Sequence, residues 1–456
     1  MHSKKSEKSL EAFASGSIPK VVVQNCIPAL IAMMMVMVYN LADTFFIGLT
    51  HDDYQVAAVS LASPVFMIFM SLGTLFGVGG TSVISRALGA GNTDYAKKVS
   101  SFCLWSCVAV GLTFMALLWL FLDKVTVMLG ASENTMDYAR SYLGITLLCG
   151  AFSMISNCFS SVIRTEGEPM KAMTGTVLGN LLNMVLDPVM ILWLRMGITG
   201  AAVATVIGNA ASALYYLLYF RGRRTALSIR PKDFSMKDGI LKGVLSVGLS
   251  ASLANLLVSL SSIVVNGQLA KHNELFVAGY GVTSKVLMIV TLIGIGIGSG
   301  VQPLLGYCYG AKNRERLTKS IRFSVLFGLG ACLLVSVLCF VFAGPIVRVF
   351  LTKEEAYQSG IRFTRILMSS AWLIGAFAIC QNTLQAMGAA TPALLASVFR
   401  QGVIFIPALF VMQAILGVDG LIWAQPVADV LSLALVIFLL VRKIRKTDFT
   451  PAEAKA

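Results

Sequence analysis

The sequence predicts an all-α polytopic membrane protein, with about twelve transmembrane helices in two six-helix lobes related by a parallel pseudo-twofold repeat. Three observations predict this fold class: the composition, apolar stretches of membrane-spanning length, and an internal repeat. Of 456 residues, 57% are hydrophobic and only 13% are charged, whereas soluble globular domains carry about 25% charged residues. The mean hydropathy of +0.79 points the same way. The composition therefore disfavours a water-soluble fold.

Apolar stretches of roughly 20 residues recur along the chain, and each is long enough to cross a ~30 Å hydrocarbon core as a helix. They lack the ten-residue polar and apolar alternation of membrane barrel strands, so we expect helices. The predicted spans are 21–49, 56–85, 99–122, 141–163, 170–194, 200–220, 244–269, 277–306, 320–343, 361–387, 393–416 and 420–441. The first span is too long for a signal h-region and lacks a small-residue cleavage site, which predicts a retained helix.

An internal repeat relates the two halves of this series. The segment "GTLFGVGGTSVISRALGAGN" at 73–92 matches "GIGIGSGVQPLLGYCYGAKN" at 294–313 with a shift of 221 positions. Further on, "MGITGAA" at 196–202 matches "LGVDGLI" at 416–422 with a shift of 220. Each half therefore holds six helices, and an even number keeps the two copies in the same orientation across the membrane. Two lobes around a central cavity are typical of an alternating-access transporter.

The repeat divides the chain into five parts. These are an N-terminal segment 1–20, an N-lobe 21–220, a basic linker 221–242, a C-lobe 243–441 and a tail 442–456. Most of the 36 Lys and Arg residues lie on the side of the two termini, including those of the linker and Arg400. By the positive-inside rule both termini are cytoplasmic. The net charge of +14 is thereby explained without a nucleic acid partner.

A group of polar residues lies inside the apolar spans of the N-lobe. Asn180, Asn183 and Asp187 are spaced so that they share one face of the fifth helix. An aspartate inside a span costs about 2.5–3.5 kcal/mol on insertion scales and normally faces the bundle interior with a partner. Counted from the outer helix ends, Asp43 of the first helix lies at the depth of Asp187, and Thr205 of the sixth lies at a similar depth.

Two carboxyl groups that are close together in a poorly solvated cavity cannot both ionise cheaply. Such a pair could exchange a proton, or it could bind Na+ with the oxygens of Asn180, Asn183 and Thr205. The spacing does not separate these two possibilities. A third possibility is that Asp43 and Asp187 only hydrogen-bond helices together.

Five segments together resemble the multidrug and toxin extrusion (MATE) family. They are "IPALIAMMMVMVYNLADTFFIG", "GGTSVISRALGAGNTDYAKK", "RTEGEP", "NMVLDP" and "GITGAAVAT". The resemblance covers roughly residues 20–441 and is greatest to the bacterial MepA-like and DinF-like branches. It implies a secondary antiporter in the bacterial cytoplasmic membrane, with the bilayer around it, that exports cationic or amphipathic small molecules in exchange for H+ or Na+. It also implies a monomer with no cofactor beyond the coupling ion.

The resemblance carries a cation-coupling role over to individual positions of this sequence. The residues so assigned are Tyr39, Asp43, Asn180, Asn183, Asp187 and Thr205. Pro28 lies fifteen residues before Asp43 and removes a helix hydrogen bond. In the family, a proline at the matching place has been associated with bending of the first helix. A passive kink is the alternative reading of Pro28.

The C-lobe lacks a copy of the acidic pair, because the repeat maps Asp43 onto Val264 and Asp187 onto about Pro407. Instead it carries Lys285 and Asp429, which are at similar depths and could form an ion pair across the lobe. Intramembrane charges are candidates for function by default. Further polar candidates, which could contact substrate or that pair, are Gln381, Asn382 and Gln385.

Three other functions, those of a flippase, a channel and a membrane enzyme, would each predict different sequence features. A lipid-linked saccharide flippase of the wider superfamily would also be a two-lobed helical bundle, with more helices and a more basic cavity. A channel would need no titratable pair. A membrane enzyme would need a nucleophile–base set or a motif such as HExxH, and neither is present. The nine cysteines form no CxxC pair and lack metal-type spacing to histidine, which favours packing roles.

Overall fold

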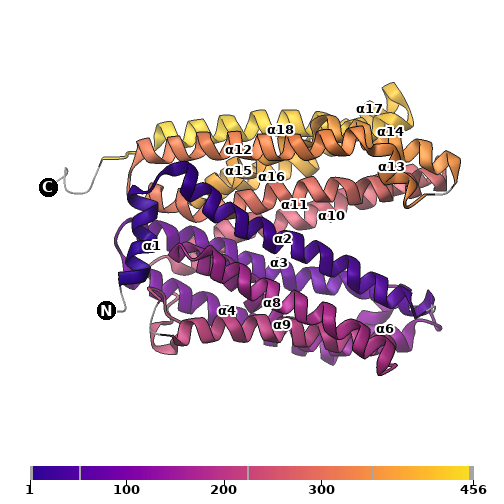
Figure 1. Cartoon of the computed structure of the whole chain (residues 1–456), viewed down its shortest axis with the longest axis horizontal. Helices are drawn as coiled ribbons and strands as arrows, with labels where there is room; N and C mark the ends of the chain where they lie inside the picture. The colour runs from indigo at the N-terminus through magenta and orange to yellow at the C-terminus, as the bar shows by residue number, and fades with distance from the viewer. Residues whose placement is uncertain (1–3, 51–52, 223–224, 352, 451–456) are drawn as a thin grey trace. The chain divides into compact units, whose positions relative to one another are not determined.

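The computed structural model describes residues 4–50, 53–222, 225–351 and 353–450, and within these ranges the chain forms helices and no strand (Figure 1). The first half contains α1 (Lys4–Ser15), α2 (Ile18–Gly48), α3 (Asp53–Gly89), α4 (Thr93–Leu120), α5 (Leu122–Met128), α6 (Met136–Leu148), α7 (Gly150–Val162), η1 (Ile163–Glu166), α8 (Pro169–Pro188), η2 (Val189–Trp193) and α9 (Gly197–Arg221). After η3 (Pro231–Asp233), the second half contains α10 (Ile240–Ala270), α11 (Glu274–Gly310), α12 (Arg314–Val341), α13 (Ala343–Arg348), α14 (Glu354–Ala371), α15 (Leu373–Ala386), α16 (Ala390–Val398), η4 (Phe399–Val403), α17 (Phe405–Leu416) and α18 (Val418–Lys446). The ends of the predicted N-terminal segment and tail, and two linker residues, lie outside these ranges.

Ten helices among the described residues are long and apolar enough to cross a membrane, and there are up to twelve spans when two bent pairs each count as one. The first pair is α6 with α7, bent by 49°, and the second is α14 with α15, bent by 45°. These pairs correspond to the predicted spans 141–163 and 361–387. The bend therefore recurs at the same place in each half, although neither breakpoint, at Cys149 and Trp372, is a proline.

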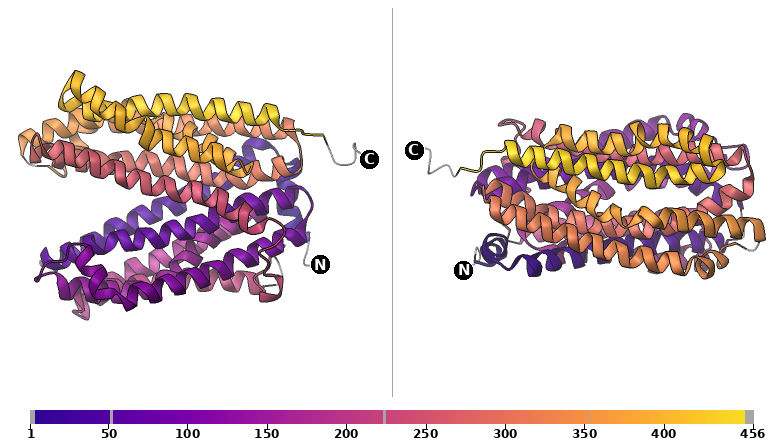
Figure 2. Two further views of the ribbon diagram at one scale, coloured as in Figure 1. Left: turned by 180° about the vertical axis from the view of Figure 1, so that it is seen from behind. Right: turned by 90° about the horizontal axis from the view of Figure 1, so that it is seen from above.

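Two other spans contain a π-helical turn. In the first half, η2 follows α8 directly, and in the second half η4 separates α16 from α17. A π turn inserts one extra residue per turn and rotates the side chains that follow it, and such turns are frequent at functional sites. By contrast, α18 is one unbroken helix in both views of Figure 2.

The chain forms two compact units. One comprises Met1–Ser15 and Ile31–Gly248, and the other comprises Gly16–Leu30 and Leu249–Ala456. The start of α2 thus belongs to the second unit, and the start of α10 belongs to the first. Glycines make both contacts possible, because a Cβ added at Gly300 would lie 2.9 Å from the backbone oxygen of Asn25, and one added at Gly79 would collide with the backbone of Val244.

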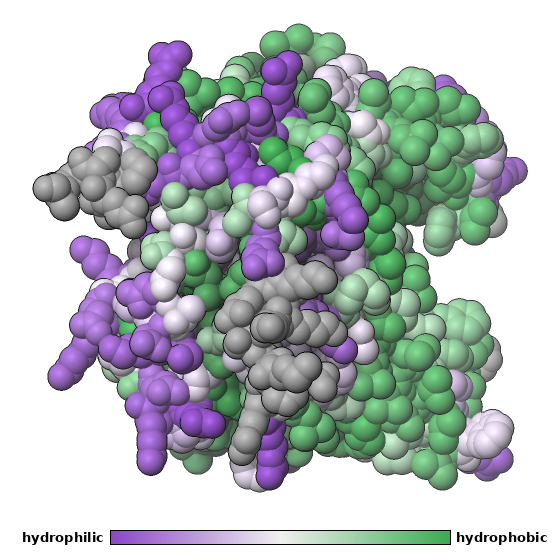
Figure 3. Space-filling view, turned by 60° about the vertical axis from the view of Figure 1, so that its left-hand side comes forward, coloured by the Kyte–Doolittle hydropathy of each residue, from purple (hydrophilic) through white to green (hydrophobic). Residues whose placement is uncertain are grey.

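Each unit has its own apolar core. In the first unit, Phe69, Phe102, Phe159 and Tyr216 are fully buried between helices. In the second unit, Val290, Phe363, Leu367, Ile374 and Leu409 belong to one buried cluster. Large apolar side chains are also exposed along the outer faces of the helices, as lipid contact requires; examples are Leu120, Trp193, Ile263, Leu334 and Phe438. Figure 3 shows hydrophobic side chains over the right-hand part of this face and hydrophilic ones gathered on the left.

Candidate functional site

The first unit brings the predicted polar residues of α2, α8 and α9 together. Two glycines allow α8 and α9 to pack closely, because a Cβ added at Gly208 would lie 2.7 Å from the backbone oxygen of Gly179 and 3.0 Å from the Cβ of Asn183. This close approach places Asn183 against Thr205. The side chain of Asp187 is fully buried one turn further along α8.

The amide of Asn183 ties these helices together. In one orientation its Nδ2 donates to Oγ1 of Thr205 at 3.3 Å. In the flipped orientation Nδ2 donates to Oδ2 of Asp187 at 3.1 Å, while the amide oxygen accepts from the backbone N–H of Thr205 at 3.1 Å. The flipped orientation satisfies both ends of the amide, so we assign it. Asn183 therefore fixes one carboxylate oxygen of Asp187.

Asp43 lies within electrostatic range of Asp187, as their spacing from the outer helix ends predicts. Tyr39 and Tyr142 are near both carboxyl groups. In each of the two acids, Oδ1 is buried without a hydrogen-bond partner among the described residues. Neither acid has an ion-pair partner in that part of the chain. Two open carboxylate oxygens in one buried site can accept a proton or a hard cation.

Two predicted members of the site have other surroundings. Asn180 lies on the predicted face of α8, but its Nδ2 is buried without a hydrogen-bond partner among the described residues. Pro28 lies in the part of α2 that belongs to the second unit, three residues before the division at Ile31. Tyr142 of α6 was not predicted from the sequence, since a single tyrosine near a helix end carries no distinguishing signal.

In the second unit, Asp429 forms an ion pair with Arg400 and not with Lys285, which its depth had made a possible partner. Nε and Nη2 of Arg400 donate to the same Asp429 oxygen at 3.1 and 2.9 Å. Gln425 also donates to that oxygen at 2.9 Å, and Ser370 donates to the other at 3.1 Å. Lys285 is exposed, and its ammonium lies 6.0 Å from the ring centroid of Phe350.

Arg400 itself was placed among the cytoplasmic cations, and this is wrong. The residue lies in the π turn η4, inside the candidate span Ala390–Leu416, and its side chain is 15% exposed. Its guanidinium stacks 4.5 Å from the ring centroid of Phe377. By the repeat shift of 220, Arg400 and Asp429 correspond to Asn180 and Asn209. The second unit therefore carries a closed ion pair on the helices equivalent to α8 and α9.

The three amide candidates of α15 do not surround Asp429. Nε2 of Gln381 donates to the hydroxyl of Ser397 at 2.7 Å, and Nδ2 of Asn382 donates to the backbone oxygen of Ala378 at 2.8 Å. Gln385 is buried. The Gln381 bond therefore links α15 to α16, whereas the Asn382 bond stays within α15.

Glu166, which sequence reasoning quoted within "RTEGEP" and did not single out, is fully buried at the end of η1. It accepts hydrogen bonds from Tyr219 Oη at 2.8 Å and from Thr225 Oγ1 at 2.7 Å. The backbone N–H groups of Ala226 and Leu227 also donate to it. One carboxylate thus anchors the start of the linker to the first unit.

No group of three or more His, Cys, Asp or Glu side chains in the described ranges is arranged to hold a metal ion. All nine cysteines are buried and unpaired. The site chemistry is therefore carried by carboxyl, amide and hydroxyl groups.

Comparison with known proteins gives consistent matches. The family model described as MatE matches residues 28–189 and 251–411. The chain is 30% identical to the multidrug export protein MepA of Staphylococcus aureus strain MSSA476, over 95% of this chain and 96% of that protein. It is equally similar, at 30%, to MepA of Staphylococcus haemolyticus strain JCSC1435, over 95% of each chain.

Solved structures agree with these matches. A crystal structure of MATE in complex with MaL6 superimposes with a TM-score of 0.90 and 26% identity, over 95% of this chain and 98% of that one. An outward-facing multidrug resistance MATE transporter of the MOP superfamily gives 0.90 and 25%, over 95% and 97%. The predicted fold class of a two-lobed helical membrane protein is confirmed.

Proposed function

Because this chain belongs to the MatE family of multidrug efflux transporters, which are not enzymes, we propose that it is a secondary antiporter that exports cationic or amphipathic compounds in exchange for H+ or Na+. One observation carries the proposal: the carboxyl groups of Asp43 and Asp187 lie within electrostatic range of each other, and each has a buried Oδ1 without a hydrogen-bond partner among the described residues. A static structural pair would be expected to have its oxygens hydrogen-bonded.

The coupling site works through the cost of burying charge. Two nearby carboxylates repel each other, so binding of H+ or Na+ between them is favoured when the site faces the side of high ion concentration. Asn183 and Thr205 hold Asp187 in place, and Tyr39 and Asn180 complete the polar surroundings. Loss of the negative charge weakens the hold on a cationic substrate, which is then released.

Helix α2 connects this ion site to the rest of the protein. Asp43 lies in the part of α2 that belongs to the first unit, and Pro28 lies in the part that belongs to the second. Pro28 removes a backbone hydrogen bond, so a change of charge at Asp43 can be accommodated by bending near the proline. Alternating access follows from this bending.

The membrane setting follows from the charge distribution. The helix ends on the side of the termini carry most of the basic residues, so this side is cytoplasmic. We propose from its family that the protein acts as a monomer in a bacterial cytoplasmic membrane, and the charge distribution favours an acidic site nearer the external face.

Purified protein in sealed vesicles tests the proposal. Efflux of a cationic dye is measured under an imposed pH gradient and, separately, an imposed Na+ gradient, for wild type, Asp43→Asn and Asp187→Asn. We expect both variants to lose gradient-driven efflux, and the active gradient identifies the coupling ion. Asp137→Asn, an exposed acid on α6, is the matched control and should transport normally. Full gradient-driven transport by both site variants would refute the assignment.

A further inference from the structure

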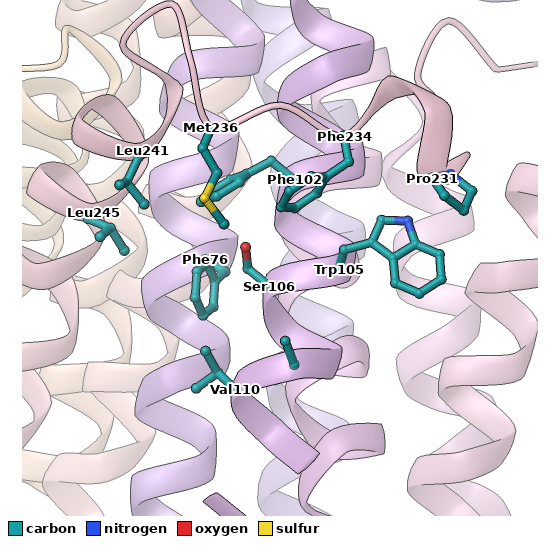
Figure 4. Close-up of a pocket in the computed structure, with 11 residues that line it drawn as sticks. Phe76, Phe102, Trp105, Ser106, Val110, Pro231, Phe234, Met236, Leu241 and Leu245 are labelled. Atoms are coloured by element: carbon teal, nitrogen blue, oxygen red, sulfur yellow. The ribbon is translucent and has the colours of Figure 1, made fainter. Parts of the chain in front are cut away.

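An apolar cavity of about 600 Å³ lies in the first unit, between the linker and the helices beneath it (Figure 4). Phe76 of α3 and Phe102 and Trp105 of α4 form its wall, and Pro231, Phe234 and Met236 of the linker cover it. Its volume falls in the ~300–1,000 Å³ range of small-molecule sites. The cavity contains none of the residues of the acidic site.

The linker is held over this cavity by hydrogen bonds to α4. Ser100 and Ser101 donate to the backbone oxygens of Ser228 and Arg230, each at 2.7 Å. The indole N–H of Trp105 donates to the oxygen of Ile229 at 3.3 Å, and Tyr95 donates to the oxygen of Asp238 at 3.1 Å. The cover is therefore part of the folded unit, anchored at several points.

The cavity extends from the helix ends into membrane depth. Trp105 lies twelve residues into α4 and Ala109 sixteen, which places them about 18 and 24 Å from the start of that helix. Leu241, which also lines the cavity, lies in the first turn of α10. Ala109 and Trp105 are exposed at the lipid-facing side of α4. An occupant can therefore enter from the bilayer.

The lining is apolar along its whole depth. Ser106 supplies the one hydroxyl among the eleven lining residues, and no charged side chain lines the cavity. The indole N–H of Trp105 is already hydrogen-bonded to the linker. A ligand therefore gains its affinity here from an apolar chain.

The rim next to the cover is basic. Arg230, Lys232, Lys237 and Lys242 each adjoin a cavity-lining residue in sequence, and all four side chains are exposed. None of the four has an acidic partner within 4.0 Å among the described residues. The nearby acids Asp233 and Asp238 are bound to Ser228 and Lys98. A cationic drug would be repelled at this rim, whereas an anionic headgroup would be attracted.

We propose that this cavity binds one acyl chain of an anionic phospholipid from the surrounding leaflet, with its headgroup at the four basic residues. Clusters of basic residues beside a membrane helix are typical of anionic lipid recognition. The bound chain fills the space under the linker. This lipid site is separate from the acidic site and does not depend on the direction or ion of transport.

Tryptophan quenching tests this proposal directly, because Trp105 lines the cavity. Of the five tryptophans, four are replaced by phenylalanine to leave Trp105 alone. The full-length protein is placed in phosphatidylcholine vesicles with increasing fractions of brominated phosphatidylglycerol or brominated phosphatidylcholine. We expect half of the Trp105 fluorescence to be quenched at a fraction of brominated phosphatidylglycerol about fivefold lower than the fraction of brominated phosphatidylcholine needed for the same effect. A variant retaining only Trp119, which is 60% exposed near the far end of α4, should show no such preference.

Two substitutions distinguish lipid binding inside the cavity from lipid contact with the outer surface of α4. Ala109→Phe fills the cavity from its exposed side and should abolish the preference at Trp105. Leu112→Phe, which is exposed on the same helix outside the cavity, should preserve it. Lys232→Gln with Lys237→Gln should reduce the preference at least twofold. Equal quenching by both lipids at Trp105, or a preference that survives Ala109→Phe, would overturn the proposal. Since the assay involves no transport, Asp43→Asn should behave as wild type even if the antiport proposal fails.

Discussion

Arg400 donates two hydrogen bonds to a single oxygen of Asp429, at 3.1 and 2.9 Å, inside an apolar span of the second unit. The Asp429 side chain is 3% exposed, and its other oxygen is bonded to Ser370. The acids of the first unit keep open oxygens, whereas this acid has none to offer a proton or cation. The first unit thus carries acids with oxygens free to bind a proton or cation, whereas the equivalent helices of the second unit carry an ion pair whose oxygens are already hydrogen-bonded.

The first prediction concerns this ion pair. Arg400→Met or Asp429→Leu alone leaves one buried charge without its partner, which typically costs about 3–5 kcal/mol. We expect either single variant to lower the free energy of unfolding by about this amount, measured by denaturation in detergent micelles. The double variant replaces both charges with apolar groups and should recover most of the loss. A double variant as unstable as the worse single variant would contradict this account.

The second prediction concerns the contact between α8 and α9. A methyl group added in Gly179→Ala would lie 2.5 Å from the backbone oxygen of Gly208 and would collide with the hydroxyl of Ser212. The helices or the Ser212 side chain must shift to make room for the methyl group, and this shift should lower the free energy of unfolding by about 1–3 kcal/mol. Gly330→Ala in α12 is the matched control, because nothing lies within 4 Å of its added methyl. The control should raise the free energy of unfolding by about 0.8–1.0 kcal/mol, because alanine has a higher helix propensity than glycine. Altered lipid contacts at this exposed position reduce that gain. Thermal unfolding of both variants distinguishes the two outcomes.

The third prediction concerns the amide that holds Asp187. Asn183→Leu keeps the side-chain size but removes the donor to Oδ2 of Asp187 and the acceptor for the N–H of Thr205. A lost bond of this kind is worth about 1–3 kcal/mol, so gradient-driven efflux should slow by at least about fivefold. The initial efflux rate is measured at several imposed gradients. Asn209→Leu removes only a bond to the backbone oxygen of Thr205 and should have a smaller effect. Equal rates in wild type and Asn183→Leu would show that the amide does not position Asp187.

The fourth prediction concerns the linker. Glu166→Ala removes the acceptor for Thr225, Ala226 and Leu227. The linker should open more often, and trypsin should cut it after Lys232 or Lys237, both exposed, at least about tenfold faster, as expected for a loss of about 1.4 kcal/mol in local stability. Glu133→Gln, an exposed acid on another loop, should leave the cleavage rate unchanged. Unchanged cleavage of Glu166→Ala would mean that other contacts suffice to hold the linker.

Much of the fold could be predicted because a bilayer demands long apolar helices, and these are visible without an alignment. The repeated glycines around Gly79 and Gly300 also revealed the two halves, since close backbone contact excludes larger residues. The bends at Cys149 and Trp372 were not predicted, because no proline marks either break and the glycine that follows Cys149 has no counterpart directly after Trp372. Helix breaks of this kind depend on packing from other helices.

The site was predicted where one helix supplied the spacing. Asn183 and Asp187 are one turn apart, so their common face follows from helix geometry. The pairing of Lys285 with Asp429 failed because counting residues gives depth along a helix and says nothing of the direction in which a side chain points. Arg400 was missed because it was counted with the cations at the cytoplasmic helix ends, although it lies within the predicted span 393–416.

The division of α2 between the two units has a consequence for biosynthesis. Cys26, near the start of this helix, donates to the backbone oxygen of Ile297, a residue 271 positions later in the chain. Proteins generally fold from the N-terminus as they leave the ribosome. Here the start of α2, which belongs to the second unit, cannot find its packing partner until α11 has been translated. A gene fragment that ends at the linker would therefore produce six inserted helices with an unfilled contact, and only co-production of the second half would complete either unit.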